Sequence, residues 1–287
     1  ESPVKLAHAD LDEVYADVTS RSDVAEAVRG QEIVLGLATR PDDPNTFFDV
    51  NVRGTFNVLD ACRNQKSVRQ VILAGSDAAV GVWLARHAKP ANEDSPLMAH
   101  PGYYAFSKVM EEAMAQQYRI QYGLPITILR MSRVFEKTDI LKHLSLRNLN
   151  PSETGHGWDD YLEDKHRAIL ARGENRILIP VGPDREPYRR HVVHIADVVQ
   201  AFQRALANPA ALGETFHIAG PAPFRYDEAA RHLSEKTGIP TCEITAPGFH
   251  SFEIDISKAR TVLGYKPKYD IIRMIDAALD CQARRKR

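Results

Sequence analysis

Hydrophobic residues in the first part of the chain alternate between strand-like runs and helical spacing. Continuous apolar runs, typical of buried strands, occupy residues 32–38, 71–75 and 125–131. Apolar residues recur at helical spacing between residues 45 and 64. Before them, Ser22 or Asp23 could cap a short helix that Gly30 ends. Strands that alternate with helices in this way predict an α/β fold with a parallel sheet and helices on both faces.

Beyond about residue 137 the order is looser. Residues 137–156 show no clear period. After them the pattern predicts helices near 158–172, 196–207, 226–237 and 270–285, and strands at 176–180, 190–194 and 214–220. We therefore expect two parts. Residues 1–136 would hold the sheet, and residues 137–287 would form a smaller mixed lobe from which some elements return to the sheet.

Composition narrows the class of protein. The chain has 287 residues, 44% of them hydrophobic, which is enough for a large core. Its net charge of -1 gives no case for nucleic acid or a membrane surface as a partner. No apolar run approaches the ~20 residues that span a bilayer. The scattered residues Cys62, Cys242 and Cys281 form neither a disulfide framework nor a zinc spacing, so we expect a reducing cytoplasm.

The candidate chemistry centres on Tyr104 and Lys108. Residues four apart on a helix lie on one face, so this phenol and this ammonium could act as one acid–base unit. A nearby positive charge lowers the phenol's pKa from about 10 and prepares it to exchange a proton with a hydroxyl or a carbonyl. Taken alone, such a pair is more often an ordinary surface face of a helix.

Ser76 gives this pair a setting. It ends the strand-like run at 71–75, and the helix that carries Tyr104 begins the next crossover. Ligands of open α/β sheets bind at the carboxyl ends of strands. Ser76 could instead cap the following turn, but the Tyr104 helix favours a functional position.

Seven segments in this order resemble the extended short-chain dehydrogenase/reductase superfamily, and within it the NAD-dependent epimerase/dehydratase family. They are residues 16–18, 35–39, 51–55 and 76–81, the pair Tyr104 and Lys108, residues 190–197, and residues 255–265. The resemblance implies a Rossmann-type doubly wound sheet in 1–136, a substrate-binding lobe in 137–287, and NAD as cofactor, with NADP left open.

The resemblance also implies roles for individual residues. Ser76, Tyr104 and Lys108 would be catalytic, with Lys108 bound to the nicotinamide ribose and holding Tyr104 as phenolate. The cofactor would be bound by Asp17, Val18, Leu37, Ala38, Thr39, Asn51, Lys108 and Val134. Asp17 and Asn51 each have an ordinary structural interpretation that is equally plausible, as a turn cap and as a polar helix position.

The substrate implied is a sugar or nucleotide sugar, bound by Ser76, Asp77, Arg133 and Arg190. We expect epimerisation through a transient keto intermediate, with Tyr104 as acid and base. Arg133 replaces the family's usual asparagine and could bind a carboxylate or phosphate, or form a structural salt bridge. Two alternatives stay open: a dehydrogenase or reductase of a smaller hydroxy or keto compound, and a non-catalytic dinucleotide sensor or scaffold.

Three further expectations follow. None of the 16 glycines forms the family's Gly-x-x-Gly-x-x-Gly phosphate loop, so we expect the printed sequence to begin downstream of it. The helices at 45–64 and 103–122 match those that form a dimer interface in relatives, which implies a homodimer. His191 and His194 lie three apart in a strand-like segment and point to opposite faces, so we expect no metal site there.

Overall fold

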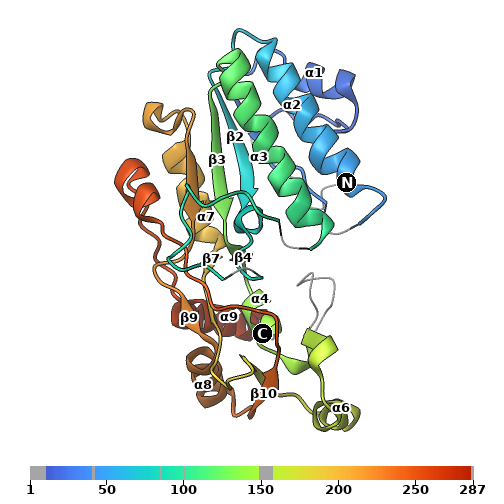
Figure 1. Ribbon diagram of the computed structural model, residues 1–287, viewed down its shortest axis with the longest axis vertical. Helices are drawn as coiled ribbons and strands as arrows, with labels where there is room; N and C mark the ends of the chain where they lie inside the picture. Colours follow the sequence, from blue (N-terminus) through green and yellow to red (C-terminus); the bar gives the residue numbers. More distant parts are fainter. Residues whose placement is uncertain (1–10, 41–42, 85, 100, 149–157, 286–287) are drawn as a thin grey trace.

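The computed structural model describes residues 11–40, 43–84, 86–99, 101–148 and 158–285. Its centre is a four-stranded parallel sheet in the order β1 (Ile33–Gly36), β2 (Gln70–Ser76), β3 (Ile126–Met131) and β8 (Thr215–Ile218). In Figure 1, α2 (Gly54–Arg63) and α3 (Tyr103–Tyr122) lie to one side of the strands and α7 (Ile195–Ala205) lies to the other. The expected α/β fold is confirmed.

The two central strands explain this layering. Successive side chains of a strand point to opposite faces. Val71 and Leu73 of β2 join the core under α2 and α3, whereas Ile72 between them joins the core on the α7 side. Both faces are buried, which is why these strands read as continuous apolar runs.

Helix α3 carries polar residues on its buried face. It ends at Gly123, whose φ of 62° is the left-handed conformation that glycine adopts without strain. Its buried residues are Ala105, Ser107, Lys108, Glu111, Glu112, Ala115 and Tyr118. A lysine and two glutamates inside a helix–sheet interface need partners there, because burying an unpaired charge is costly.

The remaining helices and strands are mostly short. They are α1 (Arg21–Val28), β4 (Arg133–Phe135), α4 (Asp139–His143), α6 (Asp164–Ala171), β5 (Ile177–Val181), β6 (Arg189–Arg190), β7 (Val192–His194), β9 (Phe224–Arg225), α8 (Tyr226–Thr237), β10 (Thr241–Thr245) and α9 (Ile271–Arg285). β4 pairs with β7, β5 with β10, and β6 with β9. The boundary after residue 136 stays a prediction. Two elements that come after it belong with the central sheet: β8 is its fourth strand, and α7 packs against β3.

Four local expectations are corrected. Ser20, not Ser22 or Asp23, caps α1, because its side chain accepts a hydrogen bond from the Asp23 amide. β1 is only partly buried, and Leu35 is 44% exposed, because β1 pairs with β2 alone among the described strands. The predicted strand at 190–194 is divided between β6 and β7. The segment 137–156 contains α4, and its residues 149–156 lie outside the described part of the chain.

The helix expected at 45–64 begins with a π-helical stretch, Phe48–Arg53, and continues as α2. Among the described residues, no helix combines the length and apolar character that a bilayer crossing needs.

Candidate active site

Ser76 stands at the carboxyl end of β2 and makes two kinds of contact. Its hydroxyl caps the following turn by accepting a hydrogen bond from the Ala78 amide at 3.1 Å. The same hydroxyl is hydrogen-bonded to the Tyr104 phenol. The turn cap and the contact with Tyr104 are therefore compatible, because the cap fixes the hydroxyl that meets Tyr104.

Lys108 lies one turn beyond Tyr104 on α3. Its Nζ is 5.5 Å from the centre of the Tyr104 ring and donates hydrogen bonds to the Ala74 carbonyl at 3.1 Å and to Glu111 Oε2 at 2.9 Å. The structure thus brings Ser76, Tyr104 and Lys108 together, as the sequence predicts. We call these three residues and Glu111 the acid–base cluster.

The surroundings of Tyr104 in the cofactor-free chain oppose the expected phenolate. Burial raises the pKa of the Tyr104 phenol, and this effect exceeds the opposing influence of the Lys108 charge and the Ser76 hydrogen bond. Asp77 and Glu111 raise that pKa further, because two carboxylates beside a phenol disfavour its anion. Within the chain itself, Lys108 therefore does not hold Tyr104 as a phenolate.

A cavity of about 560 Å³ opens beside Tyr104 and Lys108. Four of the residues predicted to bind the cofactor line it: Leu37, Thr39, Lys108 and Val134. Residues of α7 form much of the rest of the wall, which is largely apolar. Its volume lies within the usual range of ligand pockets, and a flat apolar wall with one ammonium suits a nicotinamide ring and its ribose.

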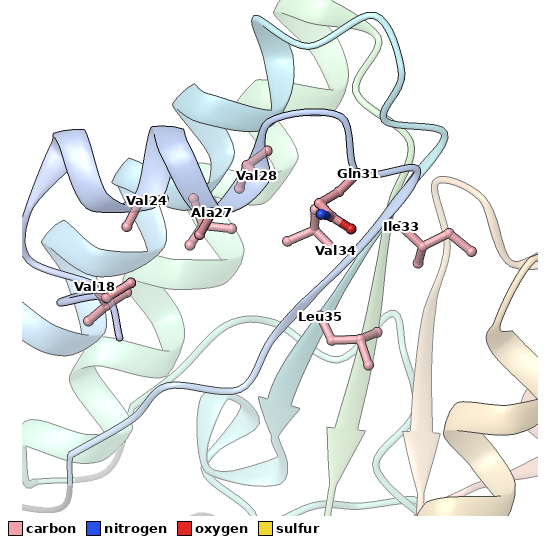
Figure 2. A pocket seen from close by; sticks show the side chains of 10 residues that line it. Val18, Val24, Ala27, Val28, Gln31, Ile33, Val34 and Leu35 are labelled. Atoms are coloured by element: carbon pink, nitrogen blue, oxygen red, sulfur yellow. The ribbon is translucent and has the colours of Figure 1, made fainter. Parts of the chain in front are cut away.

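A second pocket of about 300 Å³ lies between α1 and β1 (Figure 2). Val34 points towards α1, while Ile33 and Leu35 point away from it, as strand alternation requires. Val18 lines this pocket, and Leu35 lines both pockets, so the two are neighbours across β1. These apolar walls fit the flat adenine end of a dinucleotide.

Three other predicted cofactor residues lie outside both pocket walls. The Asp17 carboxylate accepts hydrogen bonds from the Thr19 amide and hydroxyl, both at 2.8 Å, so it caps a local turn. Ala38 is exposed beside the cavity residues Leu37 and Thr39. Asn51 is fully buried. Direct contact of all three with a cofactor stays a prediction.

Asn51 ties the loop after β1 to the catalytic helix. Its side-chain oxygen accepts from the Arg40 amide at 2.6 Å, and its Nδ2 donates to the Arg40 carbonyl at 3.0 Å. Nδ2 also lies 2.9 Å from the hydroxyl of Ser107, which sits between Tyr104 and Lys108 in the sequence. One amide thereby fixes the cofactor-side loop relative to α3.

The predicted substrate residues Arg133 and Arg190 lie with His143 in what we call the arginine cluster. The Arg190 guanidinium stacks 4.7 Å from the centre of the Trp83 ring, and its buried Nε has no hydrogen-bond partner among the described residues. Arg133 lies over Phe135 at 5.6 Å. Burial and then the charges of Arg190 and Arg133 hold the pKa of His143 well below its usual value, so it stays neutral.

Asp77, the remaining predicted substrate residue, lies beside the acid–base cluster. Its Oδ2 accepts a hydrogen bond from the Ser132 hydroxyl at 3.0 Å, and its charge acts on Tyr104. This anchored carboxylate faces the acid–base cluster, and contact with a substrate stays a prediction.

The sequence reasoning missed Glu111. This residue is 6% exposed and pairs with Lys108 inside the helix–sheet interface. Its signal was present, since an acid three residues after a lysine lies on the same helix face. What the sequence did not reveal is that this face is buried.

His191 and His194 do not approach a common ligand position. His191 is buried, with Nε2 2.9 Å from the Gly220 carbonyl and Nδ1 accepting from the Ile254 amide. His194 Nδ1 accepts from the Ala196 amide at the start of α7. No group of three potential metal ligands occurs among the residues that were described.

Comparison with known proteins identifies the family of this chain. The sequence model of the NAD dependent epimerase/dehydratase family matches residues 2–219. The chain belongs to this family. Members of the epimerase/dehydratase family use NAD, which confirms the expected class of cofactor. One curated relative is the L-arabinose 1-dehydrogenase (NAD(P)(+)) of Haloferax volcanii, 28% identical over 51% of this chain and 66% of that enzyme.

Several solved structures share the fold of this chain. A short-chain dehydrogenase/reductase superfamily protein of Agrobacterium tumefaciens with bound NAD matches with a TM-score of 0.82 and 23% identity, covering 94% of this chain and 84% of the other. The UDP-glucuronic acid 4-epimerase of Bacillus cereus in complex with NAD gives 0.71 and 18%, covering 94% and 80%. The chain spans only 36% and 66% of the first two curated relatives that it matches.

Proposed function

We propose that this epimerase/dehydratase-family chain catalyses NAD(P)-dependent hydride transfer at a hydroxyl-bearing carbon of a sugar or nucleotide sugar, with epimerisation as the net reaction. The observation that carries the proposal is the placement of Ser76, Tyr104 and Lys108. A buried hydroxyl, a phenol and an ammonium converge where the 560 Å³ cavity opens at the carboxyl ends of the strands.

The residues would divide the reaction as follows. Tyr104 takes the proton from the substrate hydroxyl and later returns it, while the Ser76 hydroxyl holds the same oxygen. Lys108 supplies the positive charge that favours the phenolate form of Tyr104. Bound NAD(P) would supply the hydride chemistry at that carbon. Return of the hydride to the other face of the keto intermediate would give the epimer.

The arginine cluster suggests which part of the substrate is recognised. Arg190 has a buried Nε that lacks a hydrogen-bond partner in the described chain, and no described carboxylate forms an ion pair with it. A guanidinium binds a carboxylate or a phosphate through two parallel hydrogen bonds. The substrate we propose therefore carries an anionic group, such as the diphosphate of a nucleotide sugar or the carboxylate of a sugar acid.

A second candidate is net dehydrogenation of a smaller hydroxy compound. Arg133 stands where the family often has asparagine, and it lies on β4, next to Val134 of the cavity wall. Its charge acts on His143 together with that of Arg190, so it belongs to the arginine cluster, which would hold the anionic group of a compact substrate. The similarity to an L-arabinose dehydrogenase also supports this candidate.

The assembly we propose is a homodimer. Four aromatic side chains on the π-helical stretch, α2 and the start of α3 are between 39% and 47% exposed: Phe48, Phe56, Tyr103 and Phe106. Exposed aromatic side chains gathered on neighbouring helices are typical of a protein interface. A cytoplasmic location, which the free cysteines favour, is part of the same proposal.

The deciding experiment incubates the chain with NAD or NADP and a panel of sugars, sugar acids and nucleotide sugars. Reduced nicotinamide is followed by absorbance and products are separated by chromatography. Product isomers without net reduced cofactor support the epimerase, and stoichiometric reduced cofactor supports the dehydrogenase. Cofactor binding without either product would overturn both in favour of a sensor or scaffold.

A further inference from the structure

The Lys108 ammonium lies near Tyr104 and also pairs with a second buried acid, Glu111. Glu111 Oε2 lies 2.9 Å from Nζ, and both side chains are less than a tenth exposed. The Ala74 carbonyl accepts another of the three Nζ protons. Only one proton of the ammonium is then left to point towards the ribose or the Tyr104 side of the cavity.

The surroundings of Glu111 make its charge easy to remove. Its Oε1 is buried without a hydrogen-bond partner among the described residues. The neighbouring Glu112 is fully engaged by Arg130 of β3, with contacts of 2.8 to 3.0 Å. Burial raises the pKa of Glu111 to about 7; Lys108 opposes this rise, and the Glu112 charge adds to it.

Three charged groups around Tyr104 shift the pKa of its phenol. Lys108 lowers the pKa of the phenol, whereas Asp77, from the turn after β2, and Glu111, from α3, raise it. Asp77 is held by the Ser132 hydroxyl, so its carboxylate is anchored. Glu111 is the member of this set whose charge changes close to neutral pH.

We propose that Glu111 is a positioning residue for the Tyr104–Lys108 pair: it anchors the Lys108 ammonium and, through its own charge, sets how much of that positive charge acts on Tyr104. The role builds on the proposed hydride-transfer function. A charged Glu111 neutralises Lys108 and disfavours the phenolate. A protonated Glu111 leaves Lys108 uncompensated, and the phenolate becomes easier to form.

The test is an ultraviolet titration of tyrosinate in the cofactor-free chain, with the Tyr104 signal isolated by subtracting the Tyr104→Phe variant. We expect Glu111→Gln to raise the phenolate fraction of Tyr104 at a given pH roughly tenfold, because one full charge is removed next to Lys108. Glu111→Asp retains the charge but withdraws it by one methylene, so its curve should fall between the other two.

Glu112→Gln is the matched control. Glu112 is adjacent in sequence and equally buried, but it pairs with Arg130 and not with Lys108. Its Tyr104 titration should stay within about twofold of the wild type. Glu111→Gln and Glu111→Asp curves that coincide with the wild type would overturn the proposal, as would an equal shift in Glu112→Gln. If Glu111→Gln does not fold, the Glu111→Asp curve decides in the same way.

A second readout separates positioning from mere packing. In the turnover assay, kcat of the wild type should change with pH near neutrality, whereas kcat of Glu111→Gln should lose that dependence with KM for the substrate unchanged. The tyrosine titration requires no turnover. A shifted titration in a chain without activity would therefore refute the proposed function and leave the role of Glu111 standing, and the reverse result would do the opposite.

Discussion

The acid–base cluster and the arginine cluster flank the same carboxyl end of the sheet but balance their charges differently. In the first, the Lys108 ammonium meets a buried carboxylate at 2.9 Å. In the second, the Arg190 guanidinium stacks on the Trp83 ring, and His143 stays neutral beside it. A cluster that neutralises itself is suited to moving protons. A cluster in which the buried Nε of Arg190 has no hydrogen-bond partner among the described residues is suited to holding an anion that another molecule brings.

Removing the phenol should produce the largest effect. In Tyr104→Phe the acid–base cluster keeps Lys108 and Glu111 but has no group that exchanges a proton with substrate. We expect kcat to fall about 1,000-fold, the usual scale for loss of a general acid–base group. Circular dichroism and the thermal midpoint should match the wild type. Retention of more than a tenth of the activity would show that proton transfer runs through another residue.

The contributions of the two clusters to folding stability should also change with pH in opposite directions. The pKa of Glu111 is raised from 4.5 to about 7, so its favourable contribution to folding is complete below about pH 4.5 and is lost as the pH rises towards 7. The pKa of His143 is lowered from 6.5, so its contribution is present above about pH 6.5 and is lost as the pH falls.

Urea unfolding at a series of pH values would measure both contributions. Glu111→Gln should flatten the curve between pH 4.5 and 7 by up to about 3 kcal/mol, the equivalent of the raised pKa. His143→Gln, which can still reach the Tyr226 hydroxyl, should reduce the loss below pH 6.5. Variant curves that run parallel to the wild type would mean that neither group carries the pH dependence.

Recognition of an anionic substrate by the arginine cluster can be tested by substituting the arginines. Arg190→Ala should raise KM for an anionic substrate by about 10- to 100-fold, because a hydrogen bond to a charged group contributes about 1.5–3 kcal/mol. Arg133→Ala should act in the same direction. kcat should change far less, since the acid–base cluster is intact. Equal losses with a neutral sugar of the same shape would contradict anion recognition.

A substitution on the outer face of α3 should have the smallest effect on catalytic activity. Phe106 is 47% exposed and lies in the turn between Tyr104 and Lys108, on the opposite face. Phe106→Glu should convert the proposed dimer to monomer in sedimentation, because a charge is costly inside an apolar interface. Activity per chain should stay within about twofold. An unchanged sedimentation coefficient would move the interface elsewhere.

Much of the fold was predictable because its central strands are unambiguous. The runs that became β2 and β3 are apolar on both faces, and such continuous runs between turn signals indicate buried strands. β1 gave the same pattern but is partly exposed at Leu35, since periodicity does not distinguish an edge strand from a central one. β4 was missed because its three residues are too few to show a period, and β10 because only two of its five residues are apolar.

The candidate site was predictable in its members more than in its electrostatics. The spacing of Tyr104 and Lys108 and the position of Ser76 at a strand end were enough to expect three groups in contact. In the cofactor-free chain the pKa of Tyr104 is raised, because burial, Asp77 and Glu111 together outweigh Lys108 and Ser76. Local spacing does not show how deeply the phenol is buried.

The pairing of β4 with β7 has an evolutionary consequence. This two-stranded sheet spans only three residue pairs, yet it aligns Arg133 with Val192 and thereby holds segments about sixty positions apart in register. It is separate from the four-stranded sheet that supports Tyr104. If the arginine cluster holds the substrate as we propose, substitutions at Arg133 would alter which molecule is accepted while Tyr104 and Lys108 keep their places on α3. Substitutions at Val134 would reach the reacting groups as well, because Val134 lines the cavity that opens beside them.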